Sequence, residues 1–267
     1  MTTAREQNEA EERSAPTGAV VYEAIYREGE SELARSSSAL AWSGIAAGLS
    51  MAFSFVTSAV LQARLPDQPW RPLLVALGYP VGFVIVILGR QQLFTENTLT
   101  VMLPLFRKRD GKTLVNVVRL WAVVLFSNVL GAFVMAAVLA KTDAVSNETF
   151  RGMRALAQLS LGTSFSITVL RGIFAGWLAA LTVWLLPFAE TARPWVIALI
   201  TYVVGVAHFS HVIAGAVEAA FLVIVGDSSC SEFSIGFFVP ALIGNVLGGV
   251  LLVAAINHAQ VVSGKHA

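Results

Sequence analysis

Residues 93–99 read LFTENTL, a polar stretch that directly follows the apolar run from Pro72 to Gly89. A continuous helix from Pro72 to Phe106 would be far longer than the roughly 20 residues that one membrane crossing needs. We therefore expect the helix to be interrupted at this stretch, inside the membrane. Backbone N–H and C=O groups at that depth need partners, so such a break is predicted to be buried in protein or to line an aqueous cavity.

A second polar interruption, HFSH at 208–211, falls in the middle of the later apolar run from Pro194 to Gly226. Two interrupted segments at matching places in two halves of a chain indicate a solute pathway. The sequence predicts that the second helix breaks within 90–98 and the fifth within 207–212, and that both breaks meet at one pore.

The composition is that of a multi-pass membrane protein. The chain has 267 residues, of which 56% are hydrophobic and 13% charged, with a mean hydropathy of +0.71. Soluble domains carry about 25% charged residues. We expect an all-α membrane protein with six spans, at about 39–62, 72–106 with the break, 114–140, 158–187, 194–225 and 234–257.

These spans divide the chain into a cytoplasmic segment 1–38, a channel domain 39–258 and a cytoplasmic tail 259–267. The loop 107–112 holds four basic residues and is expected inside, which places both termini of a six-span chain there. Residues 1–38 lack the apolar region of a signal peptide. We expect the first dozen residues to be disordered and residues 24–40 to form an amphipathic helix on the cytoplasmic face.

Spans one to three and four to six repeat one order: an intact helix, a broken helix, an intact helix. An odd number of spans in each half forces the halves into opposite orientations, which is an inverted repeat of three plus three helices. The identity between the halves is too weak to prove this repeat, so the prediction depends on the order of the segments.

Three motifs, in this order, resemble the formate/nitrite transporter family. They are LFT-x-NTL at 93–99, F-x-H-x-I-A at 209–214 and P-x-x-I-G-N-x-x-G-G at 240–249. The resemblance covers about residues 20–260. It implies an aquaporin-like fold, a homopentamer with a pore through each protomer, and a bacterial inner-membrane location.

Four positions depart from the family pattern. Gly176 and Gly215 stand where the family has pore-facing asparagines, Ser160 where it has a basic residue, and Gln92 where it has a carboxylate. The chain therefore resembles a divergent branch in which the scaffold is kept and the polar lining is changed.

The resemblance places the central pore histidine at His211. A histidine at a mid-membrane break can give a proton to a weak-acid anion or hydrogen-bond the anion itself; otherwise it is a neutral residue that fills the break. Thr95 is expected to face His211 across the pore, or to cap the following half-helix. Asn97 is interpreted mainly as a cap.

Apolar side chains are predicted to constrict the pore above and below its centre, where narrow apolar rings exclude hydrated ions. By resemblance these are Tyr79, Phe83, Phe94 and Val204, and Leu93 is also expected to line the pore.

Charged residues within the spans need partners. Arg171 and Glu218 are predicted to form a buried ion pair between the fourth and fifth helices; alternatively, Arg171 replaces the missing basic residue as the source of a field that attracts anions. An ionised Glu96 would repel anions, so we expect it to point toward the cytoplasmic mouth or to pair with Arg90.

The sequence therefore predicts a channel or transporter for a small monovalent weak-acid anion, passive or proton-coupled. The alternatives are a neutral-solute pore of aquaporin type and a non-transporting scaffold with a retained channel fold. No phosphate loop, metal-spaced His/Cys cluster or catalytic triad is present, so no enzyme activity or cofactor is expected. The partners expected are the solute, the lipid bilayer and further copies of the chain, with no nucleic acid.

Overall fold

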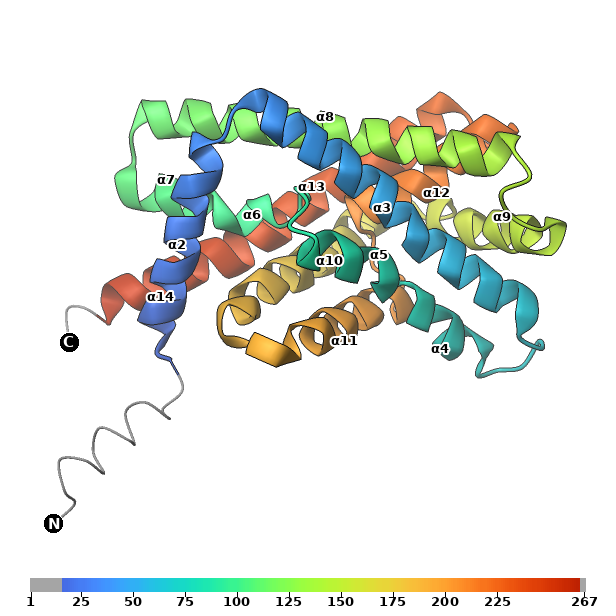
Figure 1. The fold of residues 1–267 in the computed structure, drawn as a ribbon, viewed down its shortest axis with the longest axis horizontal. Coiled ribbons are helices and arrows are strands. Elements are labelled where there is room, and N and C mark those ends of the chain that lie inside the picture. The colour runs from blue at the N-terminus through green and yellow to red at the C-terminus, as the bar shows by residue number, and fades with distance from the viewer. Residues whose placement is uncertain (1–15, 265–267) are drawn as a thin grey trace, which may run out of the picture.

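A computed structural model describes residues 16–264, and all of their regular structure is helical (Figure 1). The predicted disorder of the first dozen residues lies outside these residues. The helices are α2 (Gly18–Ala34), α3 (Ser37–Arg64), α4 (Arg71–Val75), η1 (Ala76–Gly78), α5 (Pro80–Leu88), α6 (Asn97–Thr100), α7 (Met102–Lys108), α8 (Gly111–Lys141), α9 (Asn147–Leu161), α10 (Phe165–Leu185), η2 (Leu186–Phe188), η3 (Glu190–Ala192), α11 (Arg193–Val206), α12 (Val212–Val225), η4 (Glu232–Phe238), α13 (Val239–Leu247), η5 (Gly248–Ala255) and α14 (Ile256–Ser263).

Five helical segments within the described residues are long and apolar enough to cross a membrane. They are Ser37–Arg64, Arg71–Leu88, Gly111–Lys141, Phe165–Phe188 and Glu232–Ser263. α12 is apolar as well, but has only 14 residues. The expectation of an all-helical protein with several membrane-crossing helices is confirmed.

The fourth predicted span, 158–187, begins too early. Residues up to Leu161 belong to α9, a separate amphipathic helix, and α10 begins only at Phe165. The chain turns at Gly162, and Ser164 takes the extended conformation of an N-cap. Arg171 therefore lies in the second turn of α10 and not at the centre of a long helix.

The amphipathic helix was expected at 24–40 but spans Gly18–Ala34. Ser36 starts a new helix, because its hydroxyl accepts a hydrogen bond from the N–H of Ala39 (3.3 Å). Leu40 thus belongs to α3. Hydroxyl-containing side chains favour this N-cap position over a helix interior, which is why the boundary falls there.

The buried face of α2 packs on the protein. Its buried residues are Tyr22, Ile25, Tyr26 and Gly29. Figure 1 shows α2 at the same end of the molecule as α7 and α14, whereas α4 and α9 lie at the opposite end. The two described ends of the chain therefore lie at one end of the molecule.

Candidate functional site

Two apolar helices, α5 and α11, end in the same way. α5 ends at Leu88, and the N–H of Gln91 donates to the C=O of Val86 (3.0 Å). α11 ends at Val206, and the N–H of Phe209 donates to the C=O of Val204 (3.0 Å).

The residue that turns the chain out of each helix is also equivalent. Arg90 and His208 both adopt the left-handed backbone conformation, with φ of 53° and 52°. Helical structure resumes at Asn97 in the first interruption and at Val212 in the second. The two interruptions therefore begin with the same backbone turn, although they differ in sequence and in length, residues 89–96 against residues 207–211.

Asn128 of α8 holds the first interruption in place. Its side-chain oxygen accepts from the N–H of Phe94 (2.9 Å), and its amide nitrogen donates to the C=O groups of Gln92 and Gly44 (both 2.8 Å). Asn128 is fully buried. The bonds to Phe94 and Gln92 satisfy backbone groups that the helix break leaves without intrahelical partners, and the bond to Gly44 connects the loop to α3.

Asn245 of α13 makes the equivalent bonds to the second interruption. Its oxygen accepts from the N–H of Val212 (2.9 Å), and its amide nitrogen donates to the C=O groups of Ser210 (2.8 Å) and Gly172 (2.9 Å). In each half of the chain, one asparagine of the third long helix thus bonds to the interruption and to a glycine of the first long helix, Gly44 of α3 or Gly172 of α10.

Glycines allow both asparagines to come this close. A Cβ atom on Gly48 would overlap the carbonyl oxygen of Asn128, and a Cβ atom on Gly176 would overlap that of Asn245. Gly176 was noted in the sequence for the absence of a pore asparagine; in the structure it is a helix-packing residue. Close approach of backbones at small residues is the usual basis of tight packing in membranes.

The two interruptions meet at Thr95 and His211. Their side chains are buried, and Thr95 Oγ1 lies 2.9 Å from His211 Nε2. The His211 ring also packs edge-on against Phe83, with ring centroids 4.9 Å apart.

The second ring nitrogen of His211 determines its protonation state. His211 is the N-cap of α12, and its Nδ1 accepts from the N–H of Ala214 (3.2 Å). A nitrogen that accepts carries no hydrogen, so the imidazole is the neutral tautomer with its hydrogen on Nε2. His211 therefore donates from Nε2 toward Thr95.

Two cavities approach this contact from opposite ends. The α2 cavity, about 240 Å³, includes Glu28, Glu32, Ile87, Arg90, Gln92 and Glu96. The α9 cavity, about 260 Å³, includes Ser160, Arg171, Val204, His208, His211 and Glu218.

Between the cavities lies a constriction of about 10 Å³. It shares Ile87 and Glu96 with the α2 cavity and Val204 and His211 with the α9 cavity. This volume holds about one water molecule at most. The rest of its lining is mainly apolar or hydroxyl-bearing: Phe83, Leu93, Thr95, Ala179, Thr182, Ile200 and Thr201.

The remaining predicted site residues divide between the cavities and the surrounding core. Phe83, Leu93 and Val204 line the constriction, and Tyr79 lines the α9 cavity. Phe94, by contrast, packs against Trp121 with ring centroids 5.6 Å apart and lines neither cavity.

Asn97 is not the cap that the sequence suggested. Its amide nitrogen donates to Gln92 Oε1 (3.1 Å) and to the C=O of Leu93 (3.2 Å), so it braces the first interruption from within. A cap would instead accept a hydrogen bond from a backbone N–H of the following turn.

The predicted ion pair between Arg171 and Glu218 is not formed. Both residues line the α9 cavity, but Glu218 of α12 accepts a short hydrogen bond from the hydroxyl of Ser160 in α9. The prediction failed because Ser160 was assigned to the same helix as Arg171. Because α9 is a separate helix, the Ser160 hydroxyl lies within hydrogen-bond distance of the Glu218 carboxylate and takes the place of Arg171 as its partner.

The pairing of Glu96 with Arg90 is also wrong. Arg90 forms its ion pair with Glu28 of α2 (2.9 Å), and Gln92 Nε2 donates to Glu32 of the same helix (2.9 Å). The N-terminal helix is thus bonded directly to the first interruption. Glu96 faces the α2 cavity and the constriction.

Comparison with known proteins gives the family. Residues 19–259 match the family model described as Formate/nitrite transporter. The chain belongs to the formate/nitrite transporter family. This covers nearly the whole chain, so the family and the several membrane-crossing helices place it among multi-pass membrane proteins.

Named relatives and a solved structure agree with this family. The chain is 38% identical to the inner membrane protein YfdC of Escherichia coli over 94% of this chain and 81% of YfdC. It is 25% identical to the formate channel BtFdhC of Bacillus thuringiensis over 86% and 89%. A structure of a pentameric formate channel with formate bound superposes with a TM-score of 0.72 at 22% identity, covering 85% of this chain and 98% of that one. At this identity the structure shows that the formate/nitrite transporter fold is shared.

Sequence reasoning missed Asn128 and the role of Glu32. Asn128 lies in the middle of an apolar helix, and a lone amide in such a place is a signal for a hydrogen-bonding role. Glu32 carried no comparable signal, since acidic residues are common on the exposed face of an amphipathic helix.

Proposed function

We propose that this member of the formate/nitrite transporter family conducts a small monovalent weak-acid anion across the bacterial inner membrane, passively or together with a proton. The observation that carries the proposal is the Thr95–His211 contact, at a constriction between two cavities that open toward opposite ends of the molecule. The relatives named as formate channels make formate and nitrite the first solutes to test.

The proposed topology has six spans, as an inverted repeat of three plus three. α4–α5 with α6–α7 form the second span, and α11 with α12 form the fifth, each interrupted within the membrane. Both termini are cytoplasmic, which is supported by the position of α2 and α14 at one end of the molecule. The domains are then the segment 1–38, the channel 39–258 and the tail 259–267, and the α2 cavity faces the cytoplasm.

His211 and Thr95 act in this scheme as neutral hydrogen-bond donors. An anion that reaches the constriction loses water and gains the Nε2–H of His211 and the hydroxyl of Thr95. The N-terminus of α12 lies at the same point, and helix N-termini favour negative charge. Because the N–H of Ala214 occupies Nδ1, the neutral acid forms by taking a proton from water or another group rather than from an imidazolium.

Arg171 is proposed to attract the anion into the α9 cavity. It is not paired with Glu218, and it shares this cavity with His208 and His211. A cation in a cavity with low-dielectric walls raises the local concentration of anions. The flanking apolar residues Tyr79, Phe83, Leu93 and Val204 then reject hydrated ions, whereas Phe94 and Asn97 support the loop.

The protein is proposed to be a homopentamer with one pathway in each protomer. The support is the shared fold with a structure described as pentameric. The mass of the detergent-extracted protein tests this state: a stable monomer or tetramer contradicts it.

A neutral-solute pore is the second candidate. Its support is that the side chains lining the constriction include one carboxylate, Glu96, and no Lys or Arg. A constriction that contains no cation is less selective for anions than a constriction that contains one.

Solute flux into proteoliposomes separates the two candidates. We expect uptake of formate and nitrite that increases as the pH falls, with Thr95→Val lowering it about tenfold through loss of one donor at the constriction. Thr142→Val is the control, because Thr142 is exposed, does not line the constriction, and its hydroxyl bonds only locally, to the C=O of Val138 and the N–H of Ala144. Water or glycerol flux without anion flux would instead establish the neutral pore.

A further inference from the structure

Glu96 is a carboxylate at the junction of the α2 cavity and the constriction. Its side chain borders both spaces. The Oε1 atom is buried and has no hydrogen-bond partner. None of the ion pairs among the described residues involves Glu96.

None of the cations that line the α2 cavity among the described residues is paired with Glu96. Arg90 pairs with Glu28 (2.9 Å), and Arg35 pairs with Glu32 (3.0 Å). Arg193 of α11 donates its Nε–H to the C=O of Leu186 (3.2 Å). Of the three carboxylates that line this cavity, Glu96 is therefore the one without a cation.

Apart from Arg193, which keeps its positive charge in the α2 cavity, the described elements that face Glu96 across the constriction contribute mainly uncharged side chains. Across the constriction, α10 contributes Ala179 and Thr182, α11 contributes Ile200, Thr201 and Val204, and α5 contributes Phe83 and Ile87. The one other titratable group in the constriction is His211, which is held neutral by its bond from Ala214. The electrostatic field at the α2 side of the constriction therefore depends on whether Glu96 carries a proton.

We propose that Glu96 binds a proton and thereby selects the charge state of the solute that enters the constriction from the α2 cavity. This inference rests on the proposed function, because it concerns the same pathway. Ionised, Glu96 excludes a monovalent anion by repulsion between like charges. Protonated, its hydroxyl donates a hydrogen bond to the anion's oxygen, in addition to the donors of Thr95 and His211.

The solute class that suits this arrangement is a small weak acid whose anion accepts hydrogen bonds through oxygen. Carboxylates of one or two carbons and nitrite have this chemistry. Halides lack the directed oxygen acceptors and are expected to be conducted less well. The proton on Glu96 comes from water in the α2 cavity, and ionisation returns it there.

The test is formate flux into proteoliposomes as a function of pH for the wild type and Glu96→Gln. Glutamine keeps the size and hydrogen-bonding capacity but cannot ionise. The ratio of the variant's rate to the wild-type rate removes the pH dependence of formate itself. We expect this ratio to be near one at low pH and to rise about tenfold per pH unit above the pH at which Glu96 ionises.

Glu28→Gln is the matched control. Glu28 lies in the same cavity but is paired with Arg90, so its ratio to wild type should stay constant with pH. A constant ratio for Glu96→Gln at all pH values, in a wild type that transports formate, would overturn the role of Glu96 and leave the proposed function standing. A wild type that transports no anion at any pH refutes both.

Infrared difference spectroscopy reports proton binding without transport. A pH step changes the C=O band of every carboxyl group that titrates, Glu218 in the α9 cavity included, so Glu96 is identified by comparing variants. We expect Glu96→Gln to lose one component of the band change that the wild type and Glu28→Gln both show. A band change in Glu96→Gln identical to that of the wild type shows that the proton is bound elsewhere and contradicts the proposal, whatever the flux.

Discussion

The two interruptions begin with the same backbone turn and differ in length and in their side chains. Each follows a helix that ends at a residue in the left-handed conformation, Arg90 or His208, and each is held by an asparagine, Asn128 or Asn245. Their side chains diverge: the first carries Thr95 and is bonded to α2, whereas the second carries His211. The geometry is therefore set by helices outside the loops, which leaves the loop side chains free to supply chemistry.

The largest effect is expected from removing either asparagine. Asn128→Leu or Asn245→Leu leaves one N–H and one C=O group of the interruption buried without partners, and each such group costs about 1–3 kcal/mol. We expect both variants to lose at least about 2 kcal/mol, measured by thermal unfolding in detergent. Asn257→Leu is the control, because Asn257 bonds only to Val253 of its own helix segment. Wild-type stability in either variant would contradict the shared role.

The glycine contacts should give a smaller loss. Gly48→Ala and Gly176→Ala each place a methyl group against the carbonyl of an asparagine. Overpacking of this kind typically costs about 1–3 kcal/mol. Gly111→Ala is the control, since a Cβ atom there meets nothing within 4 Å. A loss of stability in only one of these two variants would show that the two halves of the chain are not held by equivalent contacts.

Replacing His211 tests the chemical difference between the interruptions. In His211→Asn the side-chain oxygen can still accept from the N–H of Ala214, so α12 keeps its cap, but the shorter side chain cannot reach Thr95. We expect formate flux to fall about tenfold with thermal stability nearly unchanged. A change in the shape of the pH profile would mean that His211 itself titrates, contrary to the tautomer derived from its bonds.

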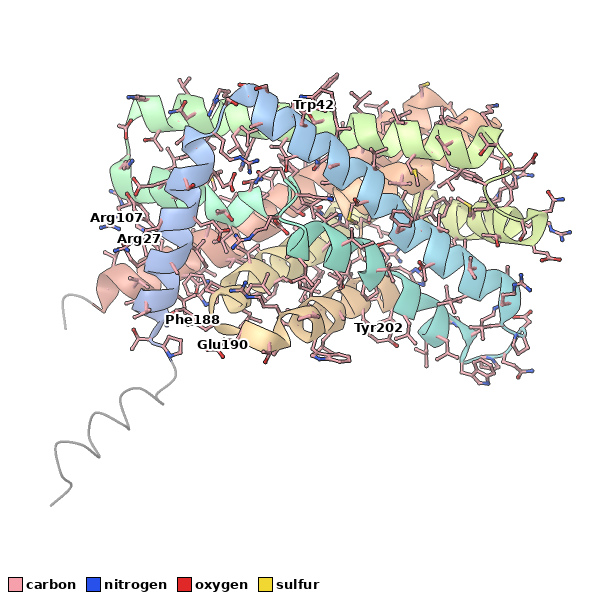
Figure 2. All side chains as sticks on the ribbon, viewed as in Figure 1. Arg27, Trp42, Arg107, Phe188, Glu190 and Tyr202 are labelled. Carbon is pink, nitrogen blue, oxygen red and sulfur yellow. The ribbon has the colours of Figure 1, made fainter. Side chains whose placement is uncertain are left out.

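The smallest effect concerns α2, which is bonded to the first interruption and not to the second. Arg27 and Arg107 both bind Glu23, at 3.2 Å and 2.8 Å (Figure 2). Two hydrogen bonds lower the pKa of Glu23 below its usual 4.5, and the bond from Arg107 has a larger effect than the bond from Arg27. The stabilisation of the folded protein by the ionised Glu23 carboxylate is therefore present above pH 4.5. It is lost as the pH falls through the lowered pKa of Glu23.

Because Glu23 and Arg107 are about half exposed and Arg27 is 77% exposed, the contribution is at most about 1 kcal/mol. Spin-label distances between α2 and α7 should show α2 loosening only in acid and at high salt. If α2 separates from α7 near neutral pH, a titratable group other than Glu23 controls the attachment.

The sequence predicted the interruptions because polar residues in an apolar run are visible without a structure. Thr95 and His211 were predicted to face one another, and the structure brings them together, although their role in conduction stays a prediction. The ion pair of Arg171 with Glu218 failed because it depended on where α9 ends, and Gly162 was not recognised as a helix stop. The equivalence of Asn128 and Asn245 could not be predicted, because it depends on three-dimensional contacts between segments that share no sequence.

The central claim is that solute passes between Thr95 and His211, and blocking the constriction tests it most directly. In a Cys230→Ser background, Val204→Cys places a thiol between the constriction and the α9 cavity, whereas Leu199→Cys places one on the exposed face of the same helix. After treatment with a small methanethiosulfonate reagent, we expect formate flux to be lost in Val204→Cys and kept in Leu199→Cys. Full flux through protein shown by mass to be labelled at Val204→Cys would contradict the account.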